Sequence, residues 1–269
     1  MMKTFETETL SKRGTMIPLT VVEADAYPAK LLLCVHGFKA NRTEDGRFLE
    51  VAKNLAADGI TSVMMGFPGC DVSKEDFINY TLNNCLDDIE SARKYMEEHY
   101  EINGPLGMIG YSMGGRLTAM YIGSHPEVEC IGLWAAATYD RFGGSDEFLG
   151  VPLEIMRKEA AEKGYCDFHN GFDNTDIKLN KELVEQMDNC VLSDNLKNYK
   201  GAAIVVHGDS DITVPYQTAV DTYGLLENAR EKKLVTVKTA DHGFGAWDNH
   251  PELSKQLTDA TIEFFRSNL

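Results

Sequence analysis

The amino-acid sequence predicts an α/β fold, in which helices cover both faces of a mostly parallel sheet. Apolar runs of strand length alternate along most of the chain with segments whose apolar residues recur at helical spacing. One apolar run leads directly into Gly-x-Ser-x-Gly at 110–114 and then into a helical pattern, so a serine stands on a sharp turn between a strand and a helix. The length of 269 residues suits one large domain with an insertion, or two small domains.

The predicted strands and helices follow one another in a regular order. Two short alternating segments, 4–10 and 16–23, are joined by a turn-rich loop and predict a hairpin. Six further runs then predict strands at 30–35, 60–65, 106–110, 128–136, 202–207 and 234–238, of which the first two are expected to be buried. Helices are predicted at 43–58, 77–100, 116–122, 216–226 and 253–265. Right-handed crossovers bring the carboxyl ends of parallel strands to one edge of the sheet, where we expect the functional residues.

A single segment, 139–199, breaks this alternation and contains no convincing strand. Helical patterns at 147–163 and 177–188 flank an aromatic and polar linker at 164–172. Because a structureless loop of this length is improbable in a compact domain, we predict a helical cap inserted after the sixth strand. The core then consists of 1–138 and 200–269. The sixth and seventh strands both end at the functional edge, so the insertion is expected to lie over the serine.

Net charge and cysteine content limit the classes of partner and the cellular compartment that we expect. The 42 acidic and 26 basic residues give a formal net charge of −16, which argues against nucleic acid and anionic membranes as partners. No apolar segment of signal-peptide or membrane-span length is evident. The six cysteines are scattered, which favours free thiols and a cytoplasmic protein. No His, Cys and Asp set has metal-ligand spacing, so no metal site is expected.

The serine of the sharp turn, Ser112, is the candidate nucleophile. Such a turn forces its central residue into a strained backbone conformation, and small residues at Gly110 and Gly114 let the strand and helix approach closely. Ser112 would then lie at a helix N-terminus, where backbone N–H groups and the helix dipole favour negative charge. The alternative is a glycine-rich turn with a capping serine, so the decision depends on a base and an acid elsewhere in the chain.

A serine hydroxyl needs an oriented general base, and His242 follows the last predicted strand in a glycine-containing loop. The acid is expected after the preceding strand, where the sequence supplies two carboxylates, Asp209 and Asp211. We favour Asp211, four residues before Pro215, and keep Asp209 as the alternative. Ser112, Asp211 and His242 thus follow the fifth, seventh and eighth strands.

The other histidines have plainer interpretations. Two of them, His36 and His207, end predicted strands and are expected to pack under the active-site loops. Most of the rest are expected at the surface or at helix ends (His99, His125 and His250). His169 lies in the insertion and either lines a pocket or belongs to a solvated loop.

With this order of nucleophile, acid and histidine, the sequence resembles the α/β-hydrolase-fold serine hydrolases over nearly all of its length outside the insertion. The motifs at 36–44, 110–115 and 207–215 resemble those of the small bacterial cinnamoyl/feruloyl esterases, which carry a short cap after the sixth strand. The resemblance implies that the backbone N–H groups of Phe38 and Met113 form the oxyanion hole. The loop at 66–71 departs from the Asp-Phe-Arg-Gly-x-Gly common in that family.

We therefore expect a serine carboxylic-ester hydrolase that acts through an acyl-enzyme on small aromatic-acyl esters, without a cofactor. Four residues of the insertion, Tyr139, Asp140, Tyr165 and His169, are expected to bind the substrate, unless they only pack the insertion against the sheet. The same triad could instead cleave peptides, thioesters or lipids. Outside enzymes, a hydrolase-like ligand-binding protein remains the alternative. The expected partner is a small ester, and the sequence specifies no oligomeric state.

Overall fold

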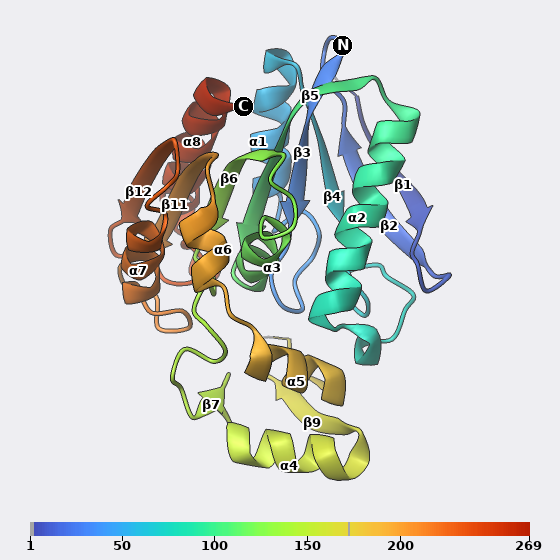
Figure 1. The fold of residues 1–269 in the computed structure, drawn as a ribbon, viewed down its shortest axis with the longest axis vertical. Helices are drawn as coiled ribbons and strands as arrows, with labels where there is room; N and C mark the ends of the chain where they lie inside the picture. Colours follow the sequence, from blue (N-terminus) through green and yellow to red (C-terminus); the bar gives the residue numbers. More distant parts are fainter. Residues whose placement is uncertain (1–2, 172) are drawn as a thin grey trace.

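The computed structural model describes residues 3–171 and 173–269 and contains an eight-stranded sheet covered by helices (Figure 1). The strands lie in the order β1-β2-β4-β3-β5-β6-β11-β12. Strand β2 pairs antiparallel with both β1 and β4, and all the other pairs are parallel. The predicted hairpin followed by six strands is confirmed. The strands are β1 (Thr4–Leu10), β2 (Met16–Val22), β3 (Ala29–Val35), β4 (Ile60–Met65), β5 (Ile102–Tyr111), β6 (Val128–Trp134), β11 (Ala202–Gly208) and β12 (Glu231–Val237).

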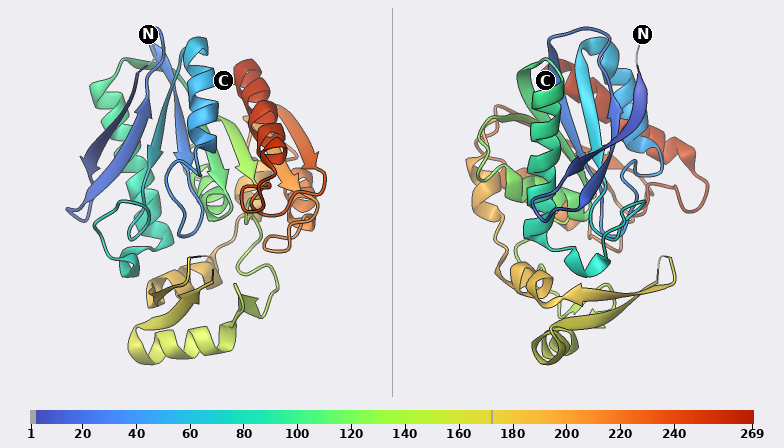
Figure 2. Two further views of the ribbon diagram at one scale, coloured as in Figure 1. Left: turned by 180° about the vertical axis from the view of Figure 1, so that it is seen from behind. Right: turned by 90° about the vertical axis from the view of Figure 1, so that its right-hand side faces the viewer.

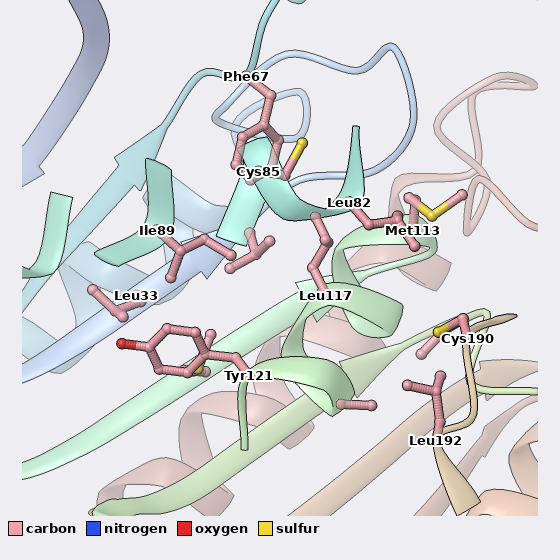
Figure 3. Close-up of a cluster of buried hydrophobic side chains, with 14 of the residues drawn as sticks. Leu33, Phe67, Leu82, Cys85, Ile89, Met113, Leu117, Tyr121, Cys190 and Leu192 are labelled. Atoms are coloured by element: carbon pink, nitrogen blue, oxygen red, sulfur yellow. The ribbon is translucent and has the colours of Figure 1, made fainter. Parts of the chain in front are cut away.

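Helices cover both faces of the sheet. On one face, α1 and α8 contact each other and bury a shared apolar cluster; they lie in front of the sheet in the left view of Figure 2. The other face is covered by α2, α3 and α7, and Figure 3 shows Leu82 and Ile89 of α2 clustered with Leu117 of α3 and Leu33 of β3. The bounds are α1 (Arg47–Leu55), α2 (Leu82–His99), α3 (Met113–Tyr121), α7 (Gln217–Leu225) and α8 (Pro251–Asn268), with short 3-10 turns η1 (Ala56–Asp58) and η2 (Phe77–Asn79).

The burial of each strand explains its pattern of apolar and polar residues in the sequence. All seven residues of β11 are buried, since α7 and α8 pack on its two sides, and the continuous apolar run at 202–206 is the result. Strand β1 lies at the edge of the sheet and alternates exposed and half-buried residues. The other edge strand, β12, is also mostly exposed or half-buried, so the two kinds of pattern separate interior strands from edge strands.

The insertion between β6 and β11 lies below the sheet in Figure 1, at the end where β3 terminates. Its position after the sixth strand agrees with the prediction, but it is not purely helical. The elements are β7 (Glu147–Phe148), β8 (Val151–Pro152), α4 (Leu153–Lys163), β9 (Tyr165–Asn170), β10 (Thr175–Asn180), α5 (Lys181–Asn189) and α6 (Ser193–Asn198).

Local signals account for the strands that the sequence interpretation missed. Gly164 has a φ of +81° and ends α4, and the chain then turns into β9. Burial alternates along β9, with Cys166, Phe168 and Asn170 facing inward, so the expected linker is the first strand of a hairpin with β10. The Asn180 side chain accepts a hydrogen bond from the Glu182 N–H and caps α5, which therefore begins later than predicted. Residue 172, at the end of the predicted linker, lies outside the described residues.

Hydrogen bonds tie the two ends of the insertion together. The Arg141 N–H donates to the Cys190 carbonyl (2.7 Å). The buried Arg116 of α3 donates to the carbonyls of Tyr139 (2.9 Å) and Arg141 (2.8 Å). The Asp140 carboxylate accepts from the N–H groups at the start of α6, of which Leu192 lies at 2.6 Å. The insertion is thus anchored beside the helix that follows Ser112.

Two further observations concern all of the described residues. The six cysteines are buried as free thiols, in agreement with the expectation of free thiols. Within residues 3–171 and 173–269, no helix combines the length and apolar character needed to cross a lipid bilayer.

Candidate active site

Ser112 lies at the turn between β5 and α3, with a φ of +52° and a ψ of −114°, and it is the N-terminal cap residue of α3. Its N–H donates to the Trp134 carbonyl of the neighbouring strand (2.8 Å), which holds the turn against β6. A Cβ on Gly110 would collide with the Gly114 carbonyl, and a Cβ on Gly114 would collide with the Val35 carbonyl. The predicted need for small residues on both sides of the serine is therefore confirmed.

The structure brings the three predicted catalytic residues into one hydrogen-bonded chain. His242 Nε2 lies 3.0 Å from Ser112 Oγ, and His242 Nδ1 lies 2.7 Å from Asp211 Oδ2. Ser112 is half-buried, and the other two side chains are buried. The carboxylate fixes the tautomer in which Nδ1 carries a proton, which leaves Nε2 free to accept the serine proton. This arrangement can generate an activated serine nucleophile.

Asp211 is held by more groups than the triad requires. Its Oδ1 accepts from the N–H groups of Thr213 and Val214, both at 2.9 Å. Its Oδ2 also lies 3.1 Å from Nε2 of His207, a fully buried residue at the end of β11. Burial raises the pKa of Asp211, but the hydrogen bonds from His207 and His242 outweigh it and lower the pKa to about 2. The carboxylate therefore stays ionised beside His242.

His207 was expected only to pack, and its contact with Asp211 is a functional detail that the sequence interpretation missed. Nε2 of His207 lies 2.8 Å from the Val214 carbonyl as well as 3.1 Å from the carboxylate. Both partners only accept hydrogen bonds, so Nε2 carries the proton. The signal was present in the sequence, because Asp211 follows four residues after His207, just beyond the end of β11.

The alternative acid, Asp209, is committed elsewhere. Its carboxylate bonds Lys238 Nζ (3.0 Å) and the Thr239 N–H (2.6 Å), and these bonds lower its pKa. Asp209 thereby fastens the loop after β12, whereas His242 bonds Asp211. The geometry favours Asp211 as the acid of the triad.

The residues proposed for the oxyanion hole lie on either side of the serine turn. Met113 is the first residue of α3, and Phe38 is in the loop after β3. That loop is fastened by the buried Glu44 carboxylate, which accepts the Gly37 N–H at 2.6 Å. The Phe38 ring makes edge-on contacts with rings from the core and from the insertion, namely Phe77, Tyr80, Phe148 and Phe168.

Ser112 opens on a pocket of about 740 Å³ between the insertion and α7. Apolar side chains in its lining include Phe38, Met113, Phe142 and Phe148. Polar side chains include Thr138, Gln217, Thr218, Asp221 and Thr222. A pocket of this size and mixed lining can hold a drug-sized molecule with an aromatic portion and several hydrogen-bonding groups.

Two of the four insertion residues predicted to bind substrate line this pocket, Tyr139 and Asp140. Asp140 already accepts hydrogen bonds on both oxygens, from Leu192 and Ser193, so its main contact is with the start of α6. Tyr165 and His169 belong to β9 and are not among the described residues that line the pocket; Lys178 lies over the Tyr165 ring, and His169 bonds Asp176 at the surface. Alternation along β9 turns both side chains away from the buried face that carries Phe168.

The remaining histidines agree with their structural interpretation. His36 is fully buried; its Nε2 accepts the Phe67 N–H, and burial lowers its pKa to about 4. His125 stacks on Tyr121, while His99 and His250 are exposed. In the part of the chain that the structure describes, no group of His, Cys, Asp and Glu side chains has an arrangement that could hold a metal ion.

Comparison with known proteins places this geometry in context. A family model described as serine aminopeptidase, S33 (Hydrolase_4), matches residues 26–158. The structure of Est1E from Butyrivibrio proteoclasticus with ferulic acid bound has a TM-score of 0.77 at 20% identity, over 96% of this chain and 99% of that one. A putative hydrolase from Agrobacterium vitis has a TM-score of 0.73 at 18% identity, over 98% and 99% of the two chains.

A third structure extends the likeness to a fungal protein. The α/β hydrolase GrgF from Penicillium has a TM-score of 0.75 at 13% identity and covers 99% of each chain. Together with the strand order and the helices on both faces of the sheet, these likenesses establish the fold. The chain has the α/β-hydrolase fold and resembles the serine hydrolases of that fold, including the cinnamoyl/feruloyl esterases.

Proposed function

We propose that this chain is a serine carboxylic-ester hydrolase that works through an acyl-enzyme and prefers small aromatic-acyl esters. The observation that carries the proposal is the hydrogen-bonded chain Ser112–His242–Asp211, whose serine lines a pocket of about 740 Å³. The strained turn presents the serine hydroxyl, and the histidine is within proton-transfer reach of it. This combination is what acyl transfer to a serine requires.

In the first half of the reaction His242 Nε2 takes the proton of Ser112 Oγ as the oxygen attacks the ester carbonyl. The negative charge that develops on the carbonyl oxygen is accepted by the backbone N–H groups of Phe38 and Met113. Asp211, ionised at neutral pH, stabilises the imidazolium through its 2.7 Å contact with Nδ1. His242 then donates its proton to the departing alcohol, which leaves Ser112 acylated.

In the second half water replaces the alcohol. His242 removes a proton from this water, whose oxygen attacks the acyl carbonyl and passes through the same stabilised oxyanion. Collapse of the intermediate returns the proton to Ser112 and releases the carboxylic acid. All groups needed for both halves belong to the chain, so no cofactor takes part in the scheme.

The pocket supports a preference for an aromatic acyl group. Phe38 and Phe148 stand edge to face in its lining with centroids 5.7 Å apart, and a flat ring can add to such a pair. Gln217 and Thr218 supply hydrogen-bonding groups for ring hydroxyls or for the alcohol, whereas the hydroxyls of Thr138 and Thr222 bond each other (2.5 Å). The structure of the similar protein Est1E was solved with ferulic acid, whose acyl group carries an aromatic ring with a hydroxyl.

A second candidate is an aminopeptidase, the activity that the description of the matching family model names. Glu147 and Asp221 line the pocket, and either carboxylate could pair with the amino group of a peptide N-terminus. The same triad and oxyanion donors would serve an amide. The two candidates differ in the substrate charge that they favour, so kinetics can separate them.

The test is a panel of hydroxycinnamoyl, aryl, alkyl and thioesters beside aminoacyl amides, together with labelling of Ser112 by a fluorophosphonate. We expect the highest kcat/KM on hydroxycinnamoyl esters. Ser112→Ala should lose about 10⁴-fold or more in turnover and all labelling, with an unchanged circular dichroism spectrum. Preference for aminoacyl amides would favour the aminopeptidase, and ligand binding without turnover or labelling would indicate a binding protein.

A further inference from the structure

Three loops carry the reacting groups of the proposed reaction, and each of them meets the same buried cluster. The cluster consists of Glu44, Arg47 and Tyr111, whose exposed fractions are 2%, 5% and 5%. None of the three was singled out for a role by the sequence. Glu44 lies in the loop after β3, Arg47 begins α1, and Tyr111 ends β5 directly before Ser112.

Arg47 connects the first helix with the histidine loop. Its Nη1 donates to the carbonyl of Gly243, the residue after His242, at 3.0 Å. Its Nη2 pairs with the Glu44 carboxylate at 3.3 Å, and its guanidinium carbon lies 5.0 Å from the centre of the Tyr111 ring. The guanidinium is therefore fixed on three sides, by groups from two loops and from the end of β5.

Glu44 extends the cluster to the loop of the proposed oxyanion hole. While one carboxylate oxygen faces Arg47, the other accepts the Gly37 N–H at 2.6 Å. Gly37 directly precedes Phe38, whose N–H is the proposed oxyanion donor. A single carboxylate thus links the peptide next to that donor with the arginine that holds the histidine loop.

Tyr111 closes the connection on the side of the nucleophile. Its hydroxyl donates to the His242 carbonyl at 2.6 Å. A Cβ added to Gly37 would lie 3.1 Å from its ring, so the ring also supports the oxyanion loop. Because Tyr111 is covalently joined to Ser112, its contacts relate both other loops to the nucleophile.

We propose that Glu44, Arg47 and Tyr111 form a buried positioning unit that holds the Phe38 loop and the His242 loop in register with Ser112. The proposal rests on the proposed hydrolase function and adds positioning residues to it. A buried ion pair contributes little net stability compared with apolar residues of similar size, so its value must be sought in the geometry that it enforces. Misplacing catalytic groups by about 1 Å can cost about 100-fold in rate.

The experiment compares the unit with a second partly buried ion pair in the same protein. The neutral double variant Glu44→Gln/Arg47→Met removes both charges together, which avoids an unpaired buried charge. The matched control removes the ion pair of Arg13 and Glu75 (2.9 Å), which joins the β1–β2 turn to the segment before α2. Because Arg13 also pairs with the buried Asp88 (2.8 Å), the control variant is Arg13→Met/Glu75→Gln/Asp88→Asn, which likewise leaves no unpaired buried charge. Tyr111→Phe removes only the hydroxyl and tests the unit should the double variant not fold.

We expect the double variant to lose about 10- to 100-fold in kcat on a hydroxycinnamoyl ester, with KM changed less than about threefold. Labelling of Ser112 by a fluorophosphonate should slow in parallel. Tyr111→Phe should lose about 3- to 10-fold in kcat, and Arg47→Lys, which keeps the charge but not the planar fork, should fall between wild type and the double variant. The control variant should change kcat less than about twofold while its melting temperature drops.

Unchanged kcat and labelling in folded Glu44→Gln/Arg47→Met or Tyr111→Phe would overturn the inference. So would an equal loss of kcat in the control variant, since the effect would then follow stability. Wild-type protein without ester turnover and without labelling would instead refute the proposed function, and the inference would fall with it.

Discussion

Asp211 shows how much of the proposed active site is decided by single contacts. Its two oxygens accept hydrogen bonds from two backbone N–H groups and from two histidines, His207 and His242. Asp209, two residues earlier, is exposed and bonds a lysine and a backbone N–H. Both are aspartates in one loop, so only their surroundings distinguish the acid of the triad from a surface anchor.

The first prediction separates these two carboxylates. Asp211→Asn should lower kcat by about 10⁴-fold, because the amide favours the wrong tautomer of His242. Asp209→Asn should change kcat less than about threefold, since it affects only the fastening of the loop after β12. Ester hydrolysis by both variants, with melting curves as the control for folding, checks this. The reverse ranking would move the acid to Asp209.

The second prediction concerns the pH dependence of stability. The pKa of Asp211 is about 2 in the folded protein, below the ordinary value of 3.8, so the folded state favours the ionised form. Its stabilising contribution is present above about pH 4 and is lost as the pH falls toward 2. Between pH 5 and pH 3 the loss amounts to about 1 kcal/mol of unfolding free energy.

Urea unfolding of wild type and Asp211→Asn at these two pH values measures that loss. The difference in unfolding free energy between the two proteins should shrink by about 1 kcal/mol from pH 5 to pH 3, because the variant has no carboxyl to titrate. A constant difference would show that Asp211 is not held in its ionised form by its neighbours.

Features of the site that depend on residues adjacent in the chain could be predicted from the sequence. Gly110 and Gly114 flank the serine in the chain, and their role follows from the turn alone. The contact between Arg47 and the Gly243 carbonyl joins residues 196 positions apart, and no local pattern reports it. Such contacts depend on how strands and helices assemble, so they became visible only in the folded chain.

At the scale of secondary-structure elements, the two hairpins of the insertion meet at Phe38. Phe148 of β7 and Phe168 of β9 contact the Phe38 ring with centroids 5.7 and 6.0 Å away. Phe148 also lines the pocket, whereas Phe168 is buried and is absent from the described pocket lining. The insertion therefore lines the pocket and also contacts the loop of the proposed oxyanion hole.

The third prediction uses these two phenylalanines as a matched pair. Phe148→Leu should reduce the preference for hydroxycinnamoyl over acetyl esters by about three- to tenfold, since one ring of the pocket is lost. Phe168→Leu should lower kcat on both esters by a similar factor, because it loosens the loop of the proposed oxyanion donor Phe38, while Phe168 itself is not among the described residues that line the pocket. The measurement is the ratio of kcat/KM on the hydroxycinnamoyl ester to kcat/KM on the acetyl ester, determined for each variant. Identical ratios in the two variants would contradict the different roles assigned to the two rings.

The insertion is also where sequence interpretation was weakest. The strand β9 alternates inward and outward residues over only six positions, and its inward residues include an asparagine. Between two helical patterns so short an alternation resembles an aromatic linker. The interior strands of the core were predicted well because burial on both faces makes them mostly apolar, as in β11, and the insertion offers no such burial.

At the scale of the whole molecule, the insertion and the core share one apolar cluster. Leu153, Met156 and Leu183 of the insertion belong to the same buried cluster as Leu82 of α2 and Met113 of α3. Figure 3 shows Met113 beside Leu82 in this cluster. With the hydrogen bonds between 140–141 and 190–193, this packing argues against an insertion that could be removed without consequence for the serine.

The last prediction tests this by replacing 143–189 with a short Gly-Ser linker, which the 2.7 Å bond between Arg141 N–H and the Cys190 carbonyl makes geometrically feasible. A cap that acts on specificity alone would leave acetyl-ester hydrolysis intact. The contacts of Phe38 predict otherwise: kcat on an acetyl ester should fall at least about tenfold, since the oxyanion loop loses the rings that support it. The preference for hydroxycinnamoyl esters should disappear as well. Near-UV circular dichroism and a cooperative melting transition must first show a folded core. If a folded deletion variant keeps wild-type kcat on the acetyl ester, the insertion shapes substrate choice only, and the supporting role of Phe148 and Phe168 is wrong.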